Sequence, residues 1–268
     1  MDSAVNTLPC VDVVIPVFNG RETIRAALVS VLEQQGAWVR RIMVVDDGSR
    51  DDTAQVVQSL GSPLIELVRI SNQGVATARN IGIEKTTAEW IAFLDADDVW
   101  MPGKLQAQLT IAREQGAGLV CGSVSVQSVM ASGPISAKAL ARGNFVATSS
   151  VLVKRSVLQQ ILPIFTPRMS FAEDYLVWLK CVTVTSGYYL STKFVDYTLS
   201  ERPRYRWGQI LHSLATLNIR YAIFLRSIGA GPAQRWELGL AVFLGSLRSV
   251  LSIIKRFIRS YRAGYPSK

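Results

Sequence analysis

The chain is poor in the residues that build metal or disulfide scaffolds. It has only three cysteines, Cys10, Cys121 and Cys181, and one histidine in 268 residues. The cysteines lie far apart without zinc-ligand spacing, which argues against a disulfide scaffold or zinc module and favours a reducing compartment. The first ten residues carry an acid and no base, which argues against a secretory signal.

Glycine-rich phosphate motifs and long apolar runs are also missing. No strand is followed by G-x-G-x-x-G and no G-x-x-x-x-G-K-[ST] occurs, so hydride transfer and P-loop chemistry are not expected. After residue 200 no stretch reaches the roughly 20 apolar residues that a spanning helix needs. The longest candidate, Leu238–Leu247, is bounded by Glu237 and Arg248.

Acids are nearly absent from the last quarter of the chain. Residues 1–201 hold 17 lysines and arginines and 19 acids. Residues 202–268 hold 12 lysines and arginines and a single acid, Glu237. From Leu247 onward the pattern predicts a basic amphipathic helix, which fits either an anionic membrane surface or packing on the preceding part of the chain. Nucleic-acid binding is not expected because aromatic residues do not alternate with the charges. The predicted apolar side carries Val250, Leu251, Ile254 and Ile258, and the basic side carries Arg248, Lys255, Arg259 and Arg262.

Short β-branched runs alternate with segments of helical periodicity in the first hundred residues. Strand followed by helix, repeated, predicts right-handed crossovers and an α/β fold with a mostly parallel sheet and helices on both faces. Ser49 and Asp52 resemble a capping box for the helix through Val56 and Val57. The predicted strands are Val11–Val17, Arg41–Val45, Leu64–Ile70 and Trp90–Leu94, and a helix is predicted over Arg21–Gln34.

Polar residues follow each of the four predicted strands. Parallel sheets bind ligands beyond the carboxyl ends of their strands, so these residues should converge on one site. Several are carboxylates, which would repel a phosphate unless a divalent cation such as Mg²⁺ or Mn²⁺ lay between them. Asp95 and Asp97 are predicted to project alike from an extended loop and to hold such a cation against a nucleotide diphosphate.

Five motifs in this order resemble those of family 2 glycosyltransferases, inverting and nucleotide-sugar-dependent enzymes with the GT-A fold. The resemblance covers roughly residues 11–200. The motifs are Val14–Asn19, Val44–Ser49, Asn72–Asn80, Phe93–Asp98 and Glu173–Leu179.

The resemblance implies a role for each matching residue. Pro16 and Phe18 would hold the nucleotide base, and Asp47 would accept an N–H of uracil or guanine. Asn72 and Arg79 would form a polar pair near the ribose and diphosphate. Asp95 would lie near the ribose, and Asp97 would coordinate the metal. Asp174 would be the catalytic base that takes the proton of an acceptor hydroxyl.

Structural alternatives exist for several of these residues. Asp46 and Ser49 could shape a turn and cap a helix, Phe18 could be a core residue, and Glu173 with Asp174 could be an acid pair favoured at a helix N-terminus. Asp98 is predicted to cap a helix or support the site. The acceptor cannot be inferred, because Leu162–Phe171 stands where many relatives have a glycine-rich segment. The motif Q-x-x-R-W, which the family's membrane-embedded polymerising synthases carry, is absent, so processive synthesis is not expected.

The sequence therefore predicts an inverting glycosyltransferase of hexosyltransferase type, dependent on Mn²⁺ or Mg²⁺. A UDP-sugar is the favoured donor, and the acceptor is a hydroxyl in cell-surface polysaccharide or lipid-linked oligosaccharide synthesis. The expected location is cytoplasmic, with or without peripheral contact at the inner face of the membrane. Alternatives are a sugar-phosphate nucleotidyltransferase and a catalytically silent, membrane-associated nucleotide-binding protein. The predicted domains are residues 1–200, with nucleotide-sugar binding in 11–100 and the acceptor side in 101–200, and a helical extension in 201–268.

Overall fold

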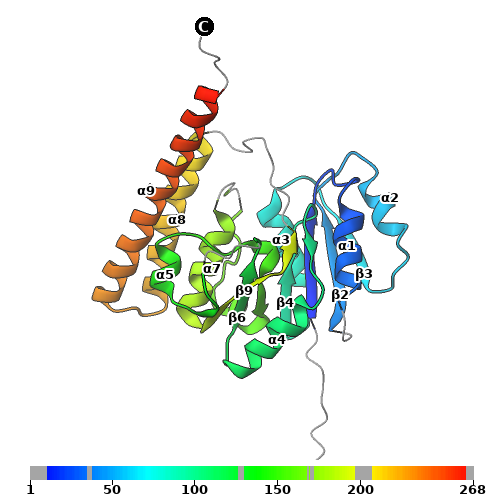
Figure 1. Cartoon of the computed structure of the whole chain (residues 1–268), viewed down its shortest axis with the longest axis horizontal. Helices are drawn as coiled ribbons and strands as arrows, with labels where there is room; N and C mark the ends of the chain where they lie inside the picture. The colour runs from blue at the N-terminus through cyan, green and yellow to red at the C-terminus, as the bar shows by residue number, and fades with distance from the viewer. Residues whose placement is uncertain are drawn as a thin grey trace, which may run out of the picture.

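The computed structural model describes residues 11–34, 38–125, 130–167, 169, 172–196 and 207–263. An eight-stranded sheet forms its centre, with strand order β3-β2-β1-β4-β8-β6-β9-β7, and β5 pairs with β10 in a small second sheet (Figure 1). The strands are β1 (Val11–Val17), β2 (Val39–Asp46), β3 (Ile65–Arg69), β4 (Trp90–Phe93), β5 (Val99–Trp100), β6 (Leu119–Ser123), β7 (Gly133–Ile135), β8 (Leu152–Lys154), β9 (Gly187–Lys193) and β10 (Val195–Asp196).

The predicted α/β architecture is confirmed, and the antiparallel strands lie in the second half of the sheet. Strands β3, β2, β1 and β4 pair in parallel, as do β6 and β9, whereas β8 runs antiparallel to both β4 and β6. The helices are α1 (Ile24–Leu32), α2 (Thr53–Gln58), α3 (Val75–Lys85), α4 (Lys104–Glu114), α5 (Ala137–Ala141), α6 (Arg155–Gln160), α7 (Glu173–Val184), α8 (Trp207–Ser227) and α9 (Pro232–Ala263), with a 3-10 turn η1 (Thr148–Ser150).

Side-chain alternation along the central strands builds a core on each face of the sheet. In β1, Val13 and Ile15 pack with α1 and α4, whereas Val14 packs on the opposite side with α3 and α7. Strand β1 is fully buried, as expected for a central parallel strand covered by helices on both faces. Helix α3 approaches β1 so closely that a side chain at Gly82 would collide with Val14.

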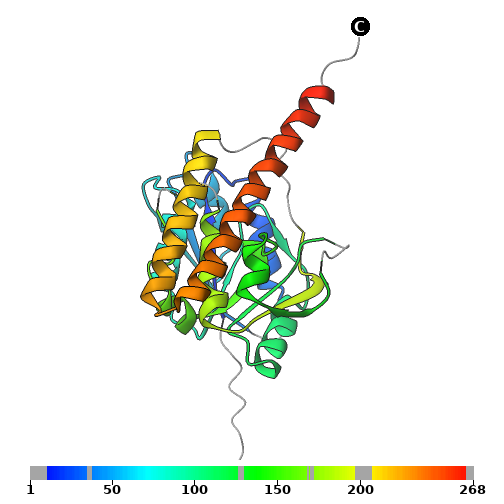
Figure 2. The ribbon, with the colours of Figure 1, turned by 90° about the vertical axis from the view of Figure 1, so that its left-hand side faces the viewer.

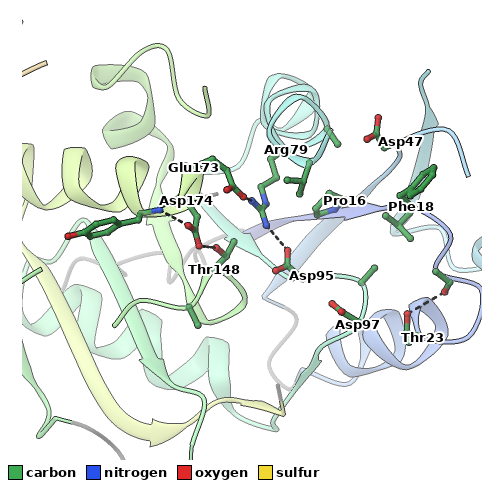
Figure 3. A pocket seen from close by; sticks show the side chains of 18 of the residues that line it. Pro16, Phe18, Thr23, Asp47, Arg79, Asp95, Asp97, Thr148, Glu173 and Asp174 are labelled. Carbon is green, nitrogen blue, oxygen red and sulfur yellow. Dashed lines mark hydrogen bonds and ion pairs between the residues drawn. The ribbon is translucent and has the colours of Figure 1, made fainter. Parts of the chain in front are cut away.

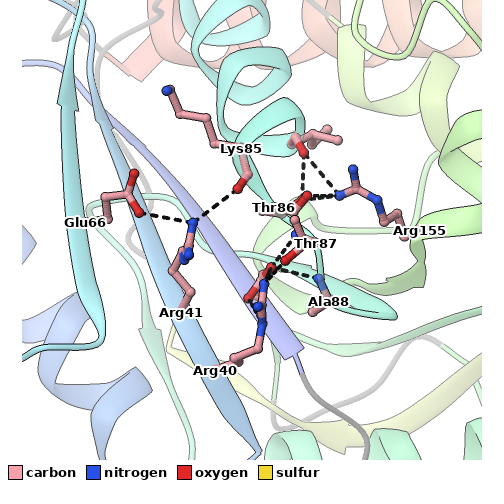
Figure 4. Close-up of polar contacts among 10 residues, drawn as sticks. Arg40, Arg41, Glu66, Lys85, Thr86, Thr87, Ala88 and Arg155 are labelled. Atoms are coloured by element: carbon pink, nitrogen blue, oxygen red, sulfur yellow. Dashed lines mark hydrogen bonds and ion pairs between the residues drawn. The ribbon is translucent and has the colours of Figure 1, made fainter.

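The amino ends of the strands are joined by charged side chains. Asp12 at the start of β1 is completely buried and pairs with Arg40 at 2.8 Å, while the backbone N–H groups of Thr87 and Ala88 donate to the same carboxylate (Figure 4). Arg41 pairs with Glu66 at 3.1 Å between β2 and β3. These contacts tie the strands together at the end of the sheet where β1 begins.

The two C-terminal helices pack on the body. Helix α8 buries Leu217 and Tyr221 against α7, and the Tyr221 hydroxyl lies 2.8 Å from that of Thr183. Helix α9 packs on α8 and α5, and Gly245 lets its backbone approach Ala141. Helix over residues 247–263 is confirmed, but the predicted residues 250, 254, 255, 258, 259 and 262 have side chains outside the described part.

Candidate functional site

A cavity of about 760 Å³ opens where the carboxyl ends of β1, β2 and β4 meet the N-terminal ends of α3 and α7 (Figure 3). It brings together seven of the eight predicted site residues, from segments far apart in the chain. These are Pro16, Phe18, Asp47, Arg79, Asp95, Asp97 and Asp174.

One end of the cavity carries the aromatic ring of Phe18. This side chain is 49% exposed, so the alternative of a core residue is wrong. A hydrogen-bond network joins the loops after β1 and β2. The backbone N–H of Asn19 donates to the Ser49 hydroxyl at 2.8 Å, and the backbone N–H of Ser49 donates to the Asp46 carboxylate at 2.8 Å. The predicted capping box is wrong, because Ser49 is used in this network and Asp52 makes no side-chain cap to α2.

Asp47 lines the cavity and also fixes the start of α3. Its two carboxylate oxygens accept the backbone N–H groups of Gln73 at 2.7 Å and Gly74 at 2.8 Å. Each oxygen keeps a second lone pair that a ligand donor can use. The carboxylate is therefore held rigidly in the cavity wall.

Asn72 is the predicted residue that the structure does not bring into the cavity. Its side chain is exposed, and it is absent from the described residues that line the cavity. The physical reason is local: Asp47 holds the backbone of the next two residues, and the backbone of Asn72 lies against Gly48, whose φ is +79°. Of the predicted pair, Arg79 therefore lines the cavity and Asn72 lies outside its described lining.

The acids after β4 lie in a turn and not in the predicted extended loop. The Asp98 N–H donates to the Asp95 carbonyl at 3.1 Å, which closes the turn, and Asp95 and Asp97 both line the cavity. Below them Ser149 accepts the Asp95 N–H at 3.0 Å and donates to the buried Asp98 carboxylate at 2.5 Å. Asp98 thus supports the turn from beneath, as the supporting alternative predicts.

Arg79 lies between two acids in the cavity wall. Its guanidinium donates to Asp95 at 2.8 Å and to Glu173 at 2.9 Å, and only 4% of the residue is exposed (Figure 3). Burial disfavours the charge, but the carboxylates of Asp95, Glu173 and Asp174 raise the pKa of Arg79 above its ordinary value, so it stays charged. Arg79 is therefore a buried, ion-paired side chain and not a solvated charge on the surface of α3.

Glu173 and Asp174 begin α7 side by side in the cavity wall, after Ala172 in the left-handed region at φ +60°. Burial, and then the Asp174 charge, raise the pKa of Glu173 to about 7, although Arg79 opposes the shift. Asp174 accepts the Thr148 hydroxyl at 2.8 Å on one oxygen and the Tyr175 N–H at 2.6 Å on the other.

Several lining residues carry no signal in the sequence. Thr148 is 26 positions from Asp174, and Leu214 on α8 reaches the cavity from the C-terminal extension. Neither belongs to a motif, because their contribution comes from packing between distant segments. The buried Glu173 adjoins a predicted base and could have been found from that neighbour.

The charges in the cavity wall fit a bound cation. Among the described residues that line it, Asp47, Asp95, Asp97, Glu173 and Asp174 are acids and Arg79 is the one base. The described residues contain no group of three or more side chains able to hold a metal alone. Mg²⁺ and Mn²⁺ commonly use one or two carboxylates together with substrate phosphates, so the donor set suits a cation that arrives with a diphosphate.

Comparison with known proteins assigns the chain to a family. Residues 12–162 match the family described as Glycosyl transferase family 2. The chain belongs to this glycosyltransferase family. The match contains six of the seven predicted residues at the cavity, and Asp174 lies beyond its end.

Curated relatives agree with this assignment. The chain is 35% identical over 127 residues to the succinoglycan biosynthesis protein ExoO of Rhizobium meliloti, covering 47% of this chain and 36% of that protein. It is 30% identical over 196 residues to an uncharacterized glycosyltransferase of Rickettsia prowazekii, covering 68% of this chain and 61% of that protein. The chain thus spans less than two thirds of the length of both relatives.

A third relative and a solved structure cover more of the chain. The Escherichia coli UDP-Glc:alpha-D-GlcNAc-diphosphoundecaprenol beta-1,3-glucosyltransferase WfgD is 26% identical over 219 residues, covering 74% of this chain and 83% of WfgD. The crystal structure of S. aureus TarS residues 1–349 matches with a TM-score of 0.75 at 18% identity, covering 90% of this chain and 72% of that one. The fold is therefore the GT-A fold.

Proposed function

We propose that this family 2 glycosyltransferase moves a hexose, with inversion, from a UDP-sugar to a hydroxyl acceptor. The observation that carries the proposal is the single cavity that holds Phe18, Asp47, Arg79, Asp97 and Asp174 at the carboxyl ends of the strands. Its volume of about 760 Å³ lies within the range of small-ligand sites. WfgD is named for a UDP-glucose donor, and a TarS structure holds UDP-GlcNAc, which supports a uridine donor here.

The donor would lie along the cavity from Phe18 to Arg79. Pro16 and Phe18 would contact the base, Asp47 would accept one of its N–H groups, and Asp95 would lie at the ribose. Arg79 keeps Asp95 in place through its ion pair of 2.8 Å. Asp97 would hold a divalent cation, which neutralises charge on the departing diphosphate when it is bound.

Asp174 would be the base of a single displacement. The acceptor oxygen attacks the anomeric carbon while its proton passes to the Asp174 carboxylate. The bond from the anomeric carbon to the diphosphate oxygen breaks, and its electron pair leaves with the nucleoside diphosphate. Thr148 and Tyr175 fix both oxygens of the base by hydrogen bonds of 2.8 and 2.6 Å.

The acceptor would belong to cell-surface polysaccharide or lipid-linked oligosaccharide synthesis, as the names of ExoO and WfgD suggest for those proteins. We place the reaction at the cytoplasmic side, where the buried free thiols of Cys121 and Cys181 would remain reduced. We keep residues 1–200 as the catalytic unit and 201–268 as its extension. Family membership does not support the nucleotidyltransferase alternative.

A thermal-shift series tests donor and metal together. UDP, GDP and dTDP would each be added with and without Mn²⁺ to the wild type, to Asp97→Asn and to the matched control Glu114→Gln on the exposed end of α4. We expect UDP with Mn²⁺ to raise Tm, since a ligand at about 100 times its Kd adds about 2.7 kcal/mol to the free energy of unfolding. Asp97→Asn should lose the Mn²⁺-dependent part of the shift, and Glu114→Gln should keep it.

Each other outcome contradicts a named part of the proposal. A shift with GDP or dTDP alone would overturn the uridine donor. A UDP shift that is the same without Mn²⁺ and in Asp97→Asn would overturn the metal role. No shift with any nucleotide would overturn the donor site.

A further inference from the structure

Exposed large hydrophobic side chains are concentrated on the C-terminal helices. Elsewhere in the described chain only Phe18, Val75, Met101 and Leu162 are large, apolar and exposed, and the first two line the cavity. A concentration of exposed apolar side chains marks an interaction surface. On α8, α9 and the turn between them the corresponding residues are Leu211, Ile219, Ile223, Ile228, Trp236, Leu240, Phe243, Leu244, Leu247 and Leu251.

The exposed residues of each helix form a stripe opposite its packed side. On α9 the stripe runs from Trp236 to Leu251 at spacings of three and four residues, whereas Leu238 and Val242 are buried. On α8 the stripe runs from Leu211 to Ile223. The two helices lie side by side at the edge of the molecule (Figure 2). Because each stripe lies opposite the packed side of its helix, the two stripes together are here called the hairpin face.

The charged side chains that the structure describes on α8 and α9 are basic except for Glu237. Arg220, Arg226 and Arg248 are exposed, and Arg235 is half-buried. Glu237 is the only acid in residues 202–268, and its carboxylate is paired with Lys138 on α5. The complementary partner is therefore apolar and negatively charged. A second copy of the same face would bring arginines against arginines, which is unfavourable.

We propose that the hairpin face lies in the headgroup region of an anionic lipid bilayer. Apolar side chains would enter the acyl boundary while the arginines pair with lipid phosphates, the arrangement of interfacial amphipathic helices. No described helix is both long and apolar enough to span a bilayer. The face differs from the segment that the sequence pattern indicates, because it uses both helices and begins at Leu211.

The orientation of α8 links this face to the cavity. Leu214 lines the cavity, while Leu211 and Ile219, on another side of the same helix, are exposed. Docking would bring the acceptor side of the cavity close to the bilayer, where a lipid-linked saccharide is held. This last step rests on the proposed function, whereas lipid binding itself does not.

Co-sedimentation of the full chain with vesicles tests the proposal. One set contains an equimolar mixture of phosphatidylglycerol and phosphatidylcholine, and the other contains phosphatidylcholine alone. We expect binding to the anionic set and a loss of about tenfold or more in Leu240→Ser/Phe243→Ser/Leu247→Ser, because several apolar side chains no longer leave water. Leu162→Ser, an exposed apolar residue of the body, should bind as the wild type does.

A charge variant and a folding check complete the test. Arg226→Gln/Arg248→Gln should weaken binding to anionic vesicles, whereas the exposed pair Arg50→Gln/Arg113→Gln should bind as the wild type does. Circular dichroism and Tm establish that each variant folds, and the UDP thermal shift separates failure of this proposal from failure of the donor site. Equal binding of all variants, no vesicle binding, or a dimer that the serine variant breaks would overturn the proposal.

Discussion

The two ends of the central sheet both bury carboxylates, but the acids have different surroundings. At the amino end Asp12 accepts from Arg40 and from the N–H groups of Thr87 and Ala88, and it does not line the cavity (Figure 4). At the carboxyl end five acids and one arginine line a cavity of about 760 Å³. Burial alone therefore does not identify a site, whereas an excess of one charge around open space does.

The largest effect is expected at the carboxyl end from Asp174→Asn. The amide cannot take the acceptor proton, so kcat should fall by about a thousandfold. Tm and the UDP thermal shift should stay close to wild type, because the amide oxygen can still accept the Tyr175 N–H while the amide NH2 donates to the Thr148 hydroxyl. Steady-state turnover of the donor measures this, and turnover retained within a few-fold would exclude Asp174 as the base.

Glu173→Gln should change how the free energy of unfolding depends on pH, and it thereby tests a buried carboxylate at the carboxyl end of the sheet. The pKa of Glu173 is raised from 4.5 to about 7, so its contribution to stability is fully present below pH 4.5 and is lost as pH rises to about 7. Relative to the wild type, the variant should gain about 3 kcal/mol in free energy of unfolding across this window. Urea unfolding at several pH values measures it, and parallel pH curves would contradict the assignment.

Asp12→Asn tests the amino end of the sheet, where the buried carboxylate has a structural role only. Burial alone would raise the pKa of Asp12, but Arg40 and the N–H groups of Ala88 and Thr87 hold it below its usual value. The variant should lose about 2 kcal/mol in free energy of unfolding at neutral pH and keep its kcat. The deficit should shrink as acid protonates Asp12 in the folded wild type. Glu66→Gln, whose pair with Arg41 is exposed, serves as control and should change little.

Thr148→Val should give the smallest change in activity. It tests whether the Thr148 hydroxyl positions the Asp174 carboxylate or whether the side chain only packs there. Loss of the hydroxyl removes one hydrogen bond to the Asp174 carboxylate, so kcat should fall by about tenfold. Thr148→Ser should restore it, because serine keeps the donor. Comparison of kcat with KM decides the case: a change confined to KM, or a serine variant as slow as valine, would contradict a positioning role.

Much of the fold, and the site residues that follow strand ends, could be predicted from local patterns. Buried β-branched runs fix the strands β1 and β4 to within a residue of their predicted bounds, and the carboxyl ends of parallel strands must meet at one edge. Phe18, Asp47, Asp95 and Asp97 follow from that rule, because each lies at or just after a strand end. Asn72 also follows a strand end but does not line the cavity, since the backbone N–H groups of Gln73 and Gly74 donate to Asp47 and fix where the turn faces.

The sequence by itself determined the parallel sheet, the acids at its edge and the basic character of the tail, because these depend on local periodicity and composition. Only the tertiary structure decided that Arg79 joins Asp95 to Glu173, that Thr148 holds Asp174, and that α8 and α9 turn an apolar face outward. The first two are contacts between segments up to 94 residues apart. Such contacts depend on how elements pack, and no local pattern encodes the packing of one helix on another.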